Sequence, residues 1–184
     1  MNAEQLQKTL RASQYAEQVL SLHHVALEQD YAVDEFKHSL STENIQQFIH
    51  DTLSNINDEI EWMKAIRILR ARLMFRWIWQ DANQLTDVVT LTRELSDFAD
   101  ASIIAAKDFA RIPLIAKYGE PIGYNGKLQD LIVIGMGKLG AQELNLSSDI
   151  DLIFAFDEQG ETNGRKSIDV QQFCILWGQK LIYL

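Results

Sequence analysis

Glycine and proline are both absent from the first 110 residues of this 184-residue chain, and all of them lie in its last 72 positions. These two residues disfavour helix interiors more than any others, so a long segment without them, rich in Leu, Ala, Gln and Glu, is typical of α-helices. We therefore predict helices over residues 3–29, 43–54, 58–80 and 86–111.

Two of the predicted helices carry apolar stripes at three- and four-residue steps, the pattern of a helix that packs one face on a core. The first stripe comprises Trp62, Ile66, Leu69, Leu73 and Trp77. The second comprises Leu91, Leu95, Phe98, Ala99, Ser102 and Ala106. We expect Trp62, Trp77, Trp79 and Trp177 to be core residues, and we predict Asn57 as a helix N-cap because acidic side chains follow it.

Composition narrows the class of protein. The 17 basic and 26 acidic side chains give a net charge of −9, which argues against a nucleic-acid binder. The N-terminus has no signal-peptide pattern, and no run approaches the roughly 18 apolar residues that cross a bilayer. The only cysteine, Cys174, lies in an apolar run, so we expect a buried thiol in a reducing compartment. We expect a cytoplasmic protein that binds neither nucleic acid nor membrane.

The pattern changes at residues 112–127. Two prolines, three glycines and an Asn-Gly pair predict loops and a tight turn there. We place the domain boundary at this point, with a helical region over 1–111 and a second domain over 112–184. The second domain reads as strand, turn, short helix, strand, a loop and a final helical run over 168–184. The expected class is α+β with a mixed sheet.

The stretch from Leu131 to Phe156 carries the chemistry. An apolar run over 131–134 leads into a glycine-rich turn, and Asp149-Ile150-Asp151 opens a second apolar run. If these residues form a strand, Asp149 and Asp151 point the same way, because residues two apart share a face. The other face can then join the core through Ile150, Leu152, Phe154 and Phe156. Two carboxylates beside a backbone loop predict a site for Mg²⁺ and a nucleotide.

One alternative is a dinucleotide-binding fold. Glycines at 135, 137 and 140 satisfy G-x-G-x-x-G, and Asp157 stands where a ribose-binding acid would follow. Only residues 141–148 separate the last glycine from Asp149, which is too short for a crossover to a parallel strand. A polymerase-β-like nucleotidyltransferase site is therefore favoured, although an isolated D-x-D is more often a solvated strand end.

Residues 135–154, G-M-G-K-L-G-A-Q-E-L-N-L-S-S-D-I-D-L-I-F, resemble the bifunctional glutamine synthetase adenylyltransferase/adenylyl-removing enzymes. The wording from Asn145 to Asp151 resembles the amino-terminal, adenylyl-removing copy of the two nucleotidyltransferase domains in that family. The resemblance implies Mg²⁺-dependent phosphorolysis, in which adenylylated glutamine synthetase and phosphate give free synthetase and ADP. It implies adenylylated glutamine synthetase, phosphate, ADP or ATP, and a PII-type signalling protein as partners.

The resemblance also implies roles for individual residues. Asp149 and Asp151 would bind Mg²⁺ and act in catalysis. The turn would present backbone N–H groups to phosphate from Gly137, Gly140 and Ala141. Lys138 pairs with a phosphate oxygen or is solvated, and Ser148 contacts phosphate or caps the strand entry. Glu143 and Asn145 are expected to brace the turn.

Two departures from the family qualify this interpretation. Ala141 stands where the family usually has Gly or Ser. The family's third metal carboxylate lies on a later strand, and this chain ends at Leu184, so we expect an incomplete metal site. The runner-up interpretation is a non-catalytic helical interaction module with a degenerate nucleotidyl domain. A basic stripe on the third predicted helix either pairs with acidic helices or docks an acidic partner; it comprises Arg67, Arg70, Arg72 and Arg76.

Overall fold

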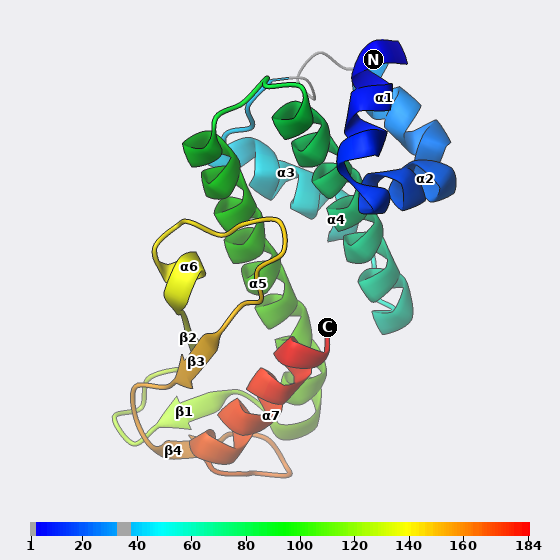
Figure 1. The fold of residues 1–184 in the computed structure, drawn as a ribbon. Coiled ribbons are helices and arrows are strands. Elements are labelled where there is room, and N and C mark those ends of the chain that lie inside the picture. The colour runs from blue at the N-terminus through cyan, green and yellow to red at the C-terminus, as the bar shows by residue number, and fades with distance from the viewer. Residues whose placement is uncertain (1–2, 33–37) are drawn as a thin grey trace. The chain divides into compact units, whose positions relative to one another are not determined.

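The computed structural model describes residues 3–32 and 38–184, which are mostly helical (Figure 1). The longer helices are α1 (Ala3–Ala12), α2 (Gln14–Ala32), α3 (Thr42–Leu53), α4 (Glu59–Ala82), α5 (Val88–Tyr118) and α7 (Val170–Tyr183). The strands and the short helix are β1 (Pro121–Gly123), β2 (Ile132–Gly135), α6 (Gly137–Gly140), β3 (Leu152–Ala155) and β4 (Gly160–Thr162). No helix in these two described ranges is long and apolar enough to cross a membrane.

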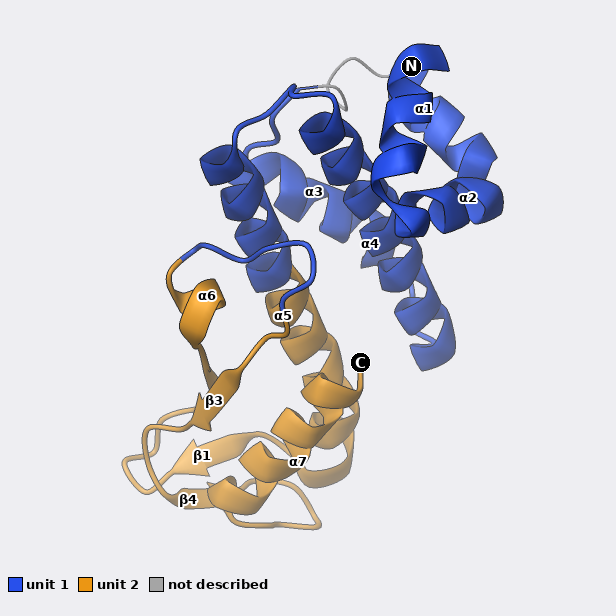
Figure 2. Ribbon diagram, in the orientation of Figure 1, with its two compact units in different colours: residues 1–101, 142–148 blue, residues 102–141, 149–184 orange. Residues whose placement is uncertain are grey.

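The chain forms two compact units (Figure 2). The first contains residues 1–101 and 142–148, and the second contains residues 102–141 and 149–184. The division falls inside α5, ten residues before the domain boundary predicted at residue 112. The segment 142–148 groups with the first unit, although the residues on either side of it belong to the second.

Helix α4 is the centre of the first unit and packs against α1, α2 and α3. Its predicted apolar stripe is confirmed, because all five residues from Trp62 to Trp77 in that stripe are buried. The ring of Tyr31 from α2 meets the rings of Phe75 and Trp79 edge to face, with centroids 6.1 and 5.0 Å apart. Edge-to-face contacts of this kind add to the energy of burying the rings.

Two predictions for the helices of this unit are wrong. The helix predicted over 3–29 is two helices, because the chain breaks at Ser13, whose hydroxyl accepts a hydrogen bond from the Ala16 backbone N–H at 3.2 Å. Helix α2 also kinks at His23. The N-cap of α4 is Asp58 rather than Asn57, since the Asp58 carboxylate accepts from the Glu61 N–H at 3.0 Å.

The predicted end of a helix at residue 111 is also wrong, because α5 continues through Pro113 to Tyr118. An interior proline lacks the N–H of a helical hydrogen bond and costs about 3 kcal/mol. Tertiary packing in the second unit offsets this cost. Ala110 is fully buried, and the Trp177 indole N–H donates to the Lys107 carbonyl at 2.7 Å. The Arg111 guanidinium lies 5.5 Å from the centroid of the same indole ring.

The four strands form two separate antiparallel pairs in the second unit. Strand β1 pairs with β4, and β2 pairs with β3 in the register Ile132↔Ala155 to Gly135↔Leu152. The α+β class is confirmed, but no parallel pairing of the predicted mixed sheet occurs within residues 3–32 and 38–184. Antiparallel β2 and β3 also exclude the dinucleotide-binding alternative, which needs a crossover between parallel strands.

Helix α7 supplies much of the core of the second unit. Asp169 caps it by accepting from the Gln172 N–H at 2.7 Å, and Phe173, Trp177 and Leu181 are buried along one side. Cys174 is buried on the same helix, as predicted. Burial, helped by the nearby Asp130 carboxylate, raises the pKa of the Cys174 thiol to about 11. The thiol is therefore neutral at physiological pH.

Candidate functional site

The glycine turn and the acid pair lie side by side at one end of the β2–β3 pair. The register places Gly135 opposite Leu152, so the residue after β2 stands opposite the residue before β3. The Met136 backbone N–H donates to the Asp151 carbonyl at 2.9 Å. This hydrogen bond extends the ladder by one step beyond both strands. It brings the start of α6 next to Asp151, as the sequence pattern predicted.

The two aspartates precede β3 rather than belong to it. The chain is irregular over 149–151, and both acids are exposed. Neither carboxylate has a hydrogen-bond or ion-pair partner among residues 3–32 and 38–184. The prediction that Ile150 faces the core is wrong, because the alternation of a strand does not extend to residue 150, and this side chain is 40% exposed. Two free carboxylates at a strand entrance are available to a ligand.

Two glycines shape the turn. Gly137 has a φ of 55°, in the left-handed region that favours glycine over residues with a Cβ. A Cβ on Gly140 would stand 2.5 Å from the Gly135 carbonyl oxygen, which is backbone and has little freedom to move. Gly140 therefore allows the end of α6 to approach the end of β2 closely. This approach fixes the turn beside the acid pair.

Some backbone N–H groups of the turn already donate hydrogen bonds within it. The Gly140 N–H donates to the Met136 carbonyl at 3.3 Å, and the Ala141 N–H donates to the Gly137 carbonyl at 3.1 Å. These two amides are thus used within the turn, and in this conformation they are not the phosphate donors that we expected. Gly137 and Lys138, at the beginning of α6 and exposed, remain at the outer side of the turn.

Asn145 organises the approach to the acid pair. Its carboxamide oxygen accepts from the Ser148 hydroxyl at 2.6 Å and from the Ser147 backbone N–H at 3.2 Å. The Ser147 hydroxyl also donates to it at 3.4 Å. In this structure Asn145 therefore braces Ser148, the residue before Asp149. Glu143, expected to share the bracing role, is exposed.

The donor set suits a magnesium ion that is shared with phosphate. No group of three or more His, Cys, Asp or Glu side chains comes together within the described part of the chain. Mg²⁺ commonly takes one or two carboxylates and completes its shell with substrate phosphates and water. Within the described part of the chain, Asp149 and Asp151 are exposed carboxylates without side-chain partners, so they match this mode of Mg²⁺ coordination.

Comparison with known proteins identifies the family of this chain. The profile of the family described as glutamate-ammonia ligase adenylyltransferase matches residues 3–184. The chain belongs to this family. It is 78% identical over all of its 184 residues to the bifunctional glutamine synthetase adenylyltransferase/adenylyl-removing enzyme of Acinetobacter baylyi, and it covers 20% of that protein.

More distant proteins with the same name are also similar. The Pseudomonas syringae protein is 44% identical over 150 residues, which is 80% of this chain and 15% of that protein. The Shewanella woodyi protein is 42% identical over 145 residues, which is 78% of this chain and 15% of that protein. The chain thus spans a fifth or less of the length of these curated relatives.

The basic stripe of this family member divides into two pairs of residues. Arg72 pairs with Asp30, and Arg76, fully buried, pairs with Glu94 at 2.6 Å. The salt-bridge interpretation is confirmed for these two. Arg67 and Arg70 are exposed, and the Arg67 guanidinium donates to the Met63 sulfur at 3.9 Å.

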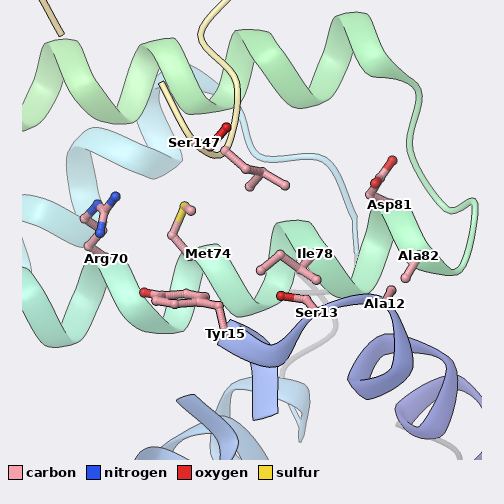
Figure 3. A pocket seen from close by; sticks show the side chains of 10 residues that line it. Ala12, Ser13, Tyr15, Arg70, Met74, Ile78, Asp81, Ala82 and Ser147 are labelled. Atoms are coloured by element: carbon pink, nitrogen blue, oxygen red, sulfur yellow. The ribbon is translucent and has the colours of Figure 1, made fainter. Parts of the chain in front are cut away.

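Arg70 lines a pocket of about 470 Å³ in the first unit (Figure 3). In Figure 3, Arg70 and Asp81 lie at opposite ends of the pocket, with Met74 and Ile78 between them. The lining residues come from α4, the α1–α2 junction and the segment 142–148; they are Ala12, Ser13, Tyr15, Arg70, Met74, Ile78, Asp81, Ala82, Leu146 and Ser147. Sequence reasoning missed this pocket, because its walls are distant in the chain.

Proposed function

We propose that this chain carries the acid pair of an adenylyl-removing site that acts on glutamine synthetase. One observation supports this most strongly: the Asp149 and Asp151 carboxylates are exposed and have no partner within residues 3–32 and 38–184, and the Asp151 backbone is one hydrogen bond away from a glycine turn. The names of the relatives give glutamine synthetase as the protein acted on and adenylyl removal as one of two activities.

The proposed reaction is a phosphorolysis. An oxygen of inorganic phosphate attacks the phosphorus of the tyrosine-bound AMP, the bond from that phosphorus to the tyrosine oxygen breaks, and the tyrosine oxygen takes a proton. The products are ADP and the unmodified synthetase. Asp149 and Asp151 would hold Mg²⁺, which when bound neutralises phosphate charge and favours in-line displacement.

The glycine turn would hold the phosphate side of the substrate. Gly137 and Lys138 begin α6 on the exposed side of the turn, and we propose that this backbone and the Lys138 ammonium face phosphate oxygens. Gly140 and Ala141 act by shaping the turn, because their N–H groups are used within it. We propose that Ser148 acts through Asn145 rather than by touching substrate.

Assignment to the removing copy rests on the wording from Asn145 to Asp151, and a polymerase-β-like nucleotidyltransferase domain is part of the same proposal. We propose that a third carboxylate, which the family resemblance implies on a later strand, completes the metal site. A PII-type protein is proposed as a further partner on the same resemblance.

The decisive experiment uses Asp149→Asn in a full-length family protein that carries this chain. ADP formation from adenylylated synthetase should be lost, and ATP-dependent adenylylation should remain within about threefold of wild type, because the second activity belongs to another domain. Asp157→Asn is the matched control, since Asp157 is also an exposed acid but follows β3, at the opposite end of the β2–β3 pair from the turn. It should leave both activities unchanged.

Two other outcomes would change the assignment. If Asp149→Asn abolishes adenylylation and spares removal, this chain belongs to the other activity. If both activities survive in Asp149→Asn and Asp151→Asn, the acid pair has no catalytic role, and the non-catalytic helical interaction module becomes the better description.

A further inference from the structure

The segment 142–148 is tied to helix α5 by two hydrogen bonds that are distant in sequence. The Leu144 backbone N–H donates to the Ser96 hydroxyl oxygen at 3.1 Å, across 48 residues. The Gln142 carboxamide donates to the Asp100 carboxylate at 2.9 Å, across 42 residues. The glycine turn ends immediately before this segment, and the acid pair begins immediately after it. The position of the segment 142–148 on α5 therefore affects both the glycine turn and the acid pair.

The contact at Ser96 is inside the protein. Ser96 is fully buried, Leu144 is also buried, and the Ser96 hydroxyl donates its own proton to the Thr92 carbonyl at 2.8 Å. The oxygen is thereby oriented to accept, and it accepts from the Leu144 backbone N–H, which lies outside the helix. A buried amide that loses its acceptor pays the full cost of desolvation. The segment therefore has one preferred place on α5.

The contact at Asp100 holds a residue in an unusual conformation. Gln142 has a φ of 59°, in the left-handed region that residues with a Cβ rarely adopt. Such conformations persist where surrounding contacts fix them. Because Ser96 and Asp100 are four residues apart, they lie on one side of α5. Together they hold the first half of the segment.

A different side of α5 is fixed to α4 and to the start of α3. The Glu94 carboxylate accepts from Arg76 at 2.6 Å and from the Trp77 indole N–H at 2.8 Å. Asp97 accepts from the Thr42 hydroxyl at 2.8 Å. The stretch that receives the segment 142–148 is thus anchored in the core of the first unit.

We propose that Ser96 and Asp100 are positioning residues for the acid pair. By holding the segment 142–148 on α5, they fix the point from which the chain proceeds through Ser148 to Asp149 and Asp151. They touch no substrate. The catalytic consequence rests on the proposed function, whereas the positioning itself is a property of this chain and can be measured without turnover.

The first test is amide hydrogen exchange in the 184-residue chain. Ser96→Ala keeps a good helix former and removes only the hydroxyl, so the Leu144 amide should exchange about tenfold faster or more. The Met136 amide, which donates to the Asp151 carbonyl, should also exchange several-fold faster. Amides in the middle of α4 should not change. Thr92→Ala is the matched control, because within residues 3–32 and 38–184 the Thr92 hydroxyl donates only to the Val89 carbonyl of its own helix.

The second test measures removal activity against Mg²⁺ concentration in a full-length family protein carrying this chain. Ser96→Ala and Asp100→Ala should raise the half-saturating Mg²⁺ concentration about fivefold or more, with the rate at saturating Mg²⁺ largely retained. Asp100→Asn keeps an oxygen acceptor for Gln142 and should restore the wild-type value. A loss of rate that higher Mg²⁺ does not recover, with no rescue by Asp100→Asn, would contradict positioning.

The two proposals fail separately. Unchanged exchange at Leu144 and Met136 in Ser96→Ala would overturn the positioning role, whatever the enzyme does. Faster exchange at Leu144 with no change at Met136 would overturn it too, because the effect would stop before the acid pair. Full removal activity in Asp149→Asn would overturn the proposed function and leave the exchange result unaffected.

Discussion

One charged pair in the first compact unit and one acid pair in the second lie in opposite environments. In the first unit Arg76 and Glu94 are 0% and 3% exposed and are paired with each other inside a tryptophan-rich core. In the second unit Asp149 and Asp151 are exposed and have no side-chain partner in the described part of the chain. A buried charge must be paired to be tolerated, whereas an exposed unpaired carboxylate costs little and stays available to a cation.

The apolar surfaces differ in the same sense. The stripe of α4 is buried, but one face of the β2–β3 pair leaves Ile132, Ile134 and Ile153 between 45% and 49% exposed. Stability and chemistry are therefore separated along the chain. The first unit holds the large buried core, and the second presents the groups that we assign to the reaction. Helix α5 contributes residues to both.

The largest effect should come from the exposed acids. Asp149→Asn and Asp151→Asn in a full-length family protein should each lower ADP formation from adenylylated synthetase about 10³-fold or more, because a lost ligand charge weakens metal binding and transition-state stabilisation together. In the 184-residue chain the same substitutions should leave the urea midpoint unchanged. A clear shift of the midpoint would show that the two acids contribute to folding stability, which would contradict this difference between the units.

The converse substitution in the first unit should affect stability. Glu94→Ala leaves Arg76 buried without its partner and should lower the free energy of unfolding by about 3–5 kcal/mol, measured by urea denaturation. Arg67→Ala, at an exposed arginine of the same helix, should change it by less than about 0.5 kcal/mol. Equal effects of the two substitutions would mean that burial of the pair does not determine its importance.

A smaller effect should come from the turn. Gly140→Ala forces a Cβ against the Gly135 carbonyl and should destabilise the second unit by about 1–3 kcal/mol, as overpacking does. Ala141→Gly, one position later, removes a methyl group instead and should cost less. Hydrogen exchange of the Met136 amide in both variants checks this. Equal protection in Gly140→Ala and wild type would show that the turn does not need its close approach.

The smallest effect concerns pH. The folded pKa of Cys174, about 11, exceeds its unfolded value near 8.5–9, so the folded state keeps a proton that the unfolded state has lost. Wild-type stability relative to Cys174→Ala should therefore be constant below about pH 8 and fall between about pH 9 and 11. Urea midpoints of the two proteins across that range test it. A constant difference would mean that the thiol is not desolvated.

Much of the first unit could be predicted from sequence, because a helix with one buried face has apolar residues at regular three- and four-residue steps. The stripe from Trp62 to Trp77 is an example. The prediction failed where distant contacts outweighed local preference. Pro113 indicated a loop, but the packing of α7 on the second half of α5 keeps the helix continuous.

In the candidate site, the pairing of the glycine turn with the acid pair was predictable, because both flank strands that are close in sequence. The irregular conformation of 149–151 was not, since alternation in the sequence does not show where a ladder stops. Ser96 and Asp100 were missed because their partners are more than 40 residues away. One local signal was available: the polar residue Ser96 lies beside the predicted apolar stripe, between Leu95 and Asp97.

The most direct test of the proposed chemistry follows isotopically labelled inorganic phosphate. Adenylylated glutamine synthetase is mixed with labelled phosphate, Mg²⁺ and a full-length family protein carrying this chain. Phosphorolysis at Asp149 and Asp151 predicts label in the β-phosphate of ADP, one ADP for each tyrosine released, and none with either Asp→Asn variant. Release of unlabelled AMP, or labelled ADP at the wild-type rate in both variants, would contradict it.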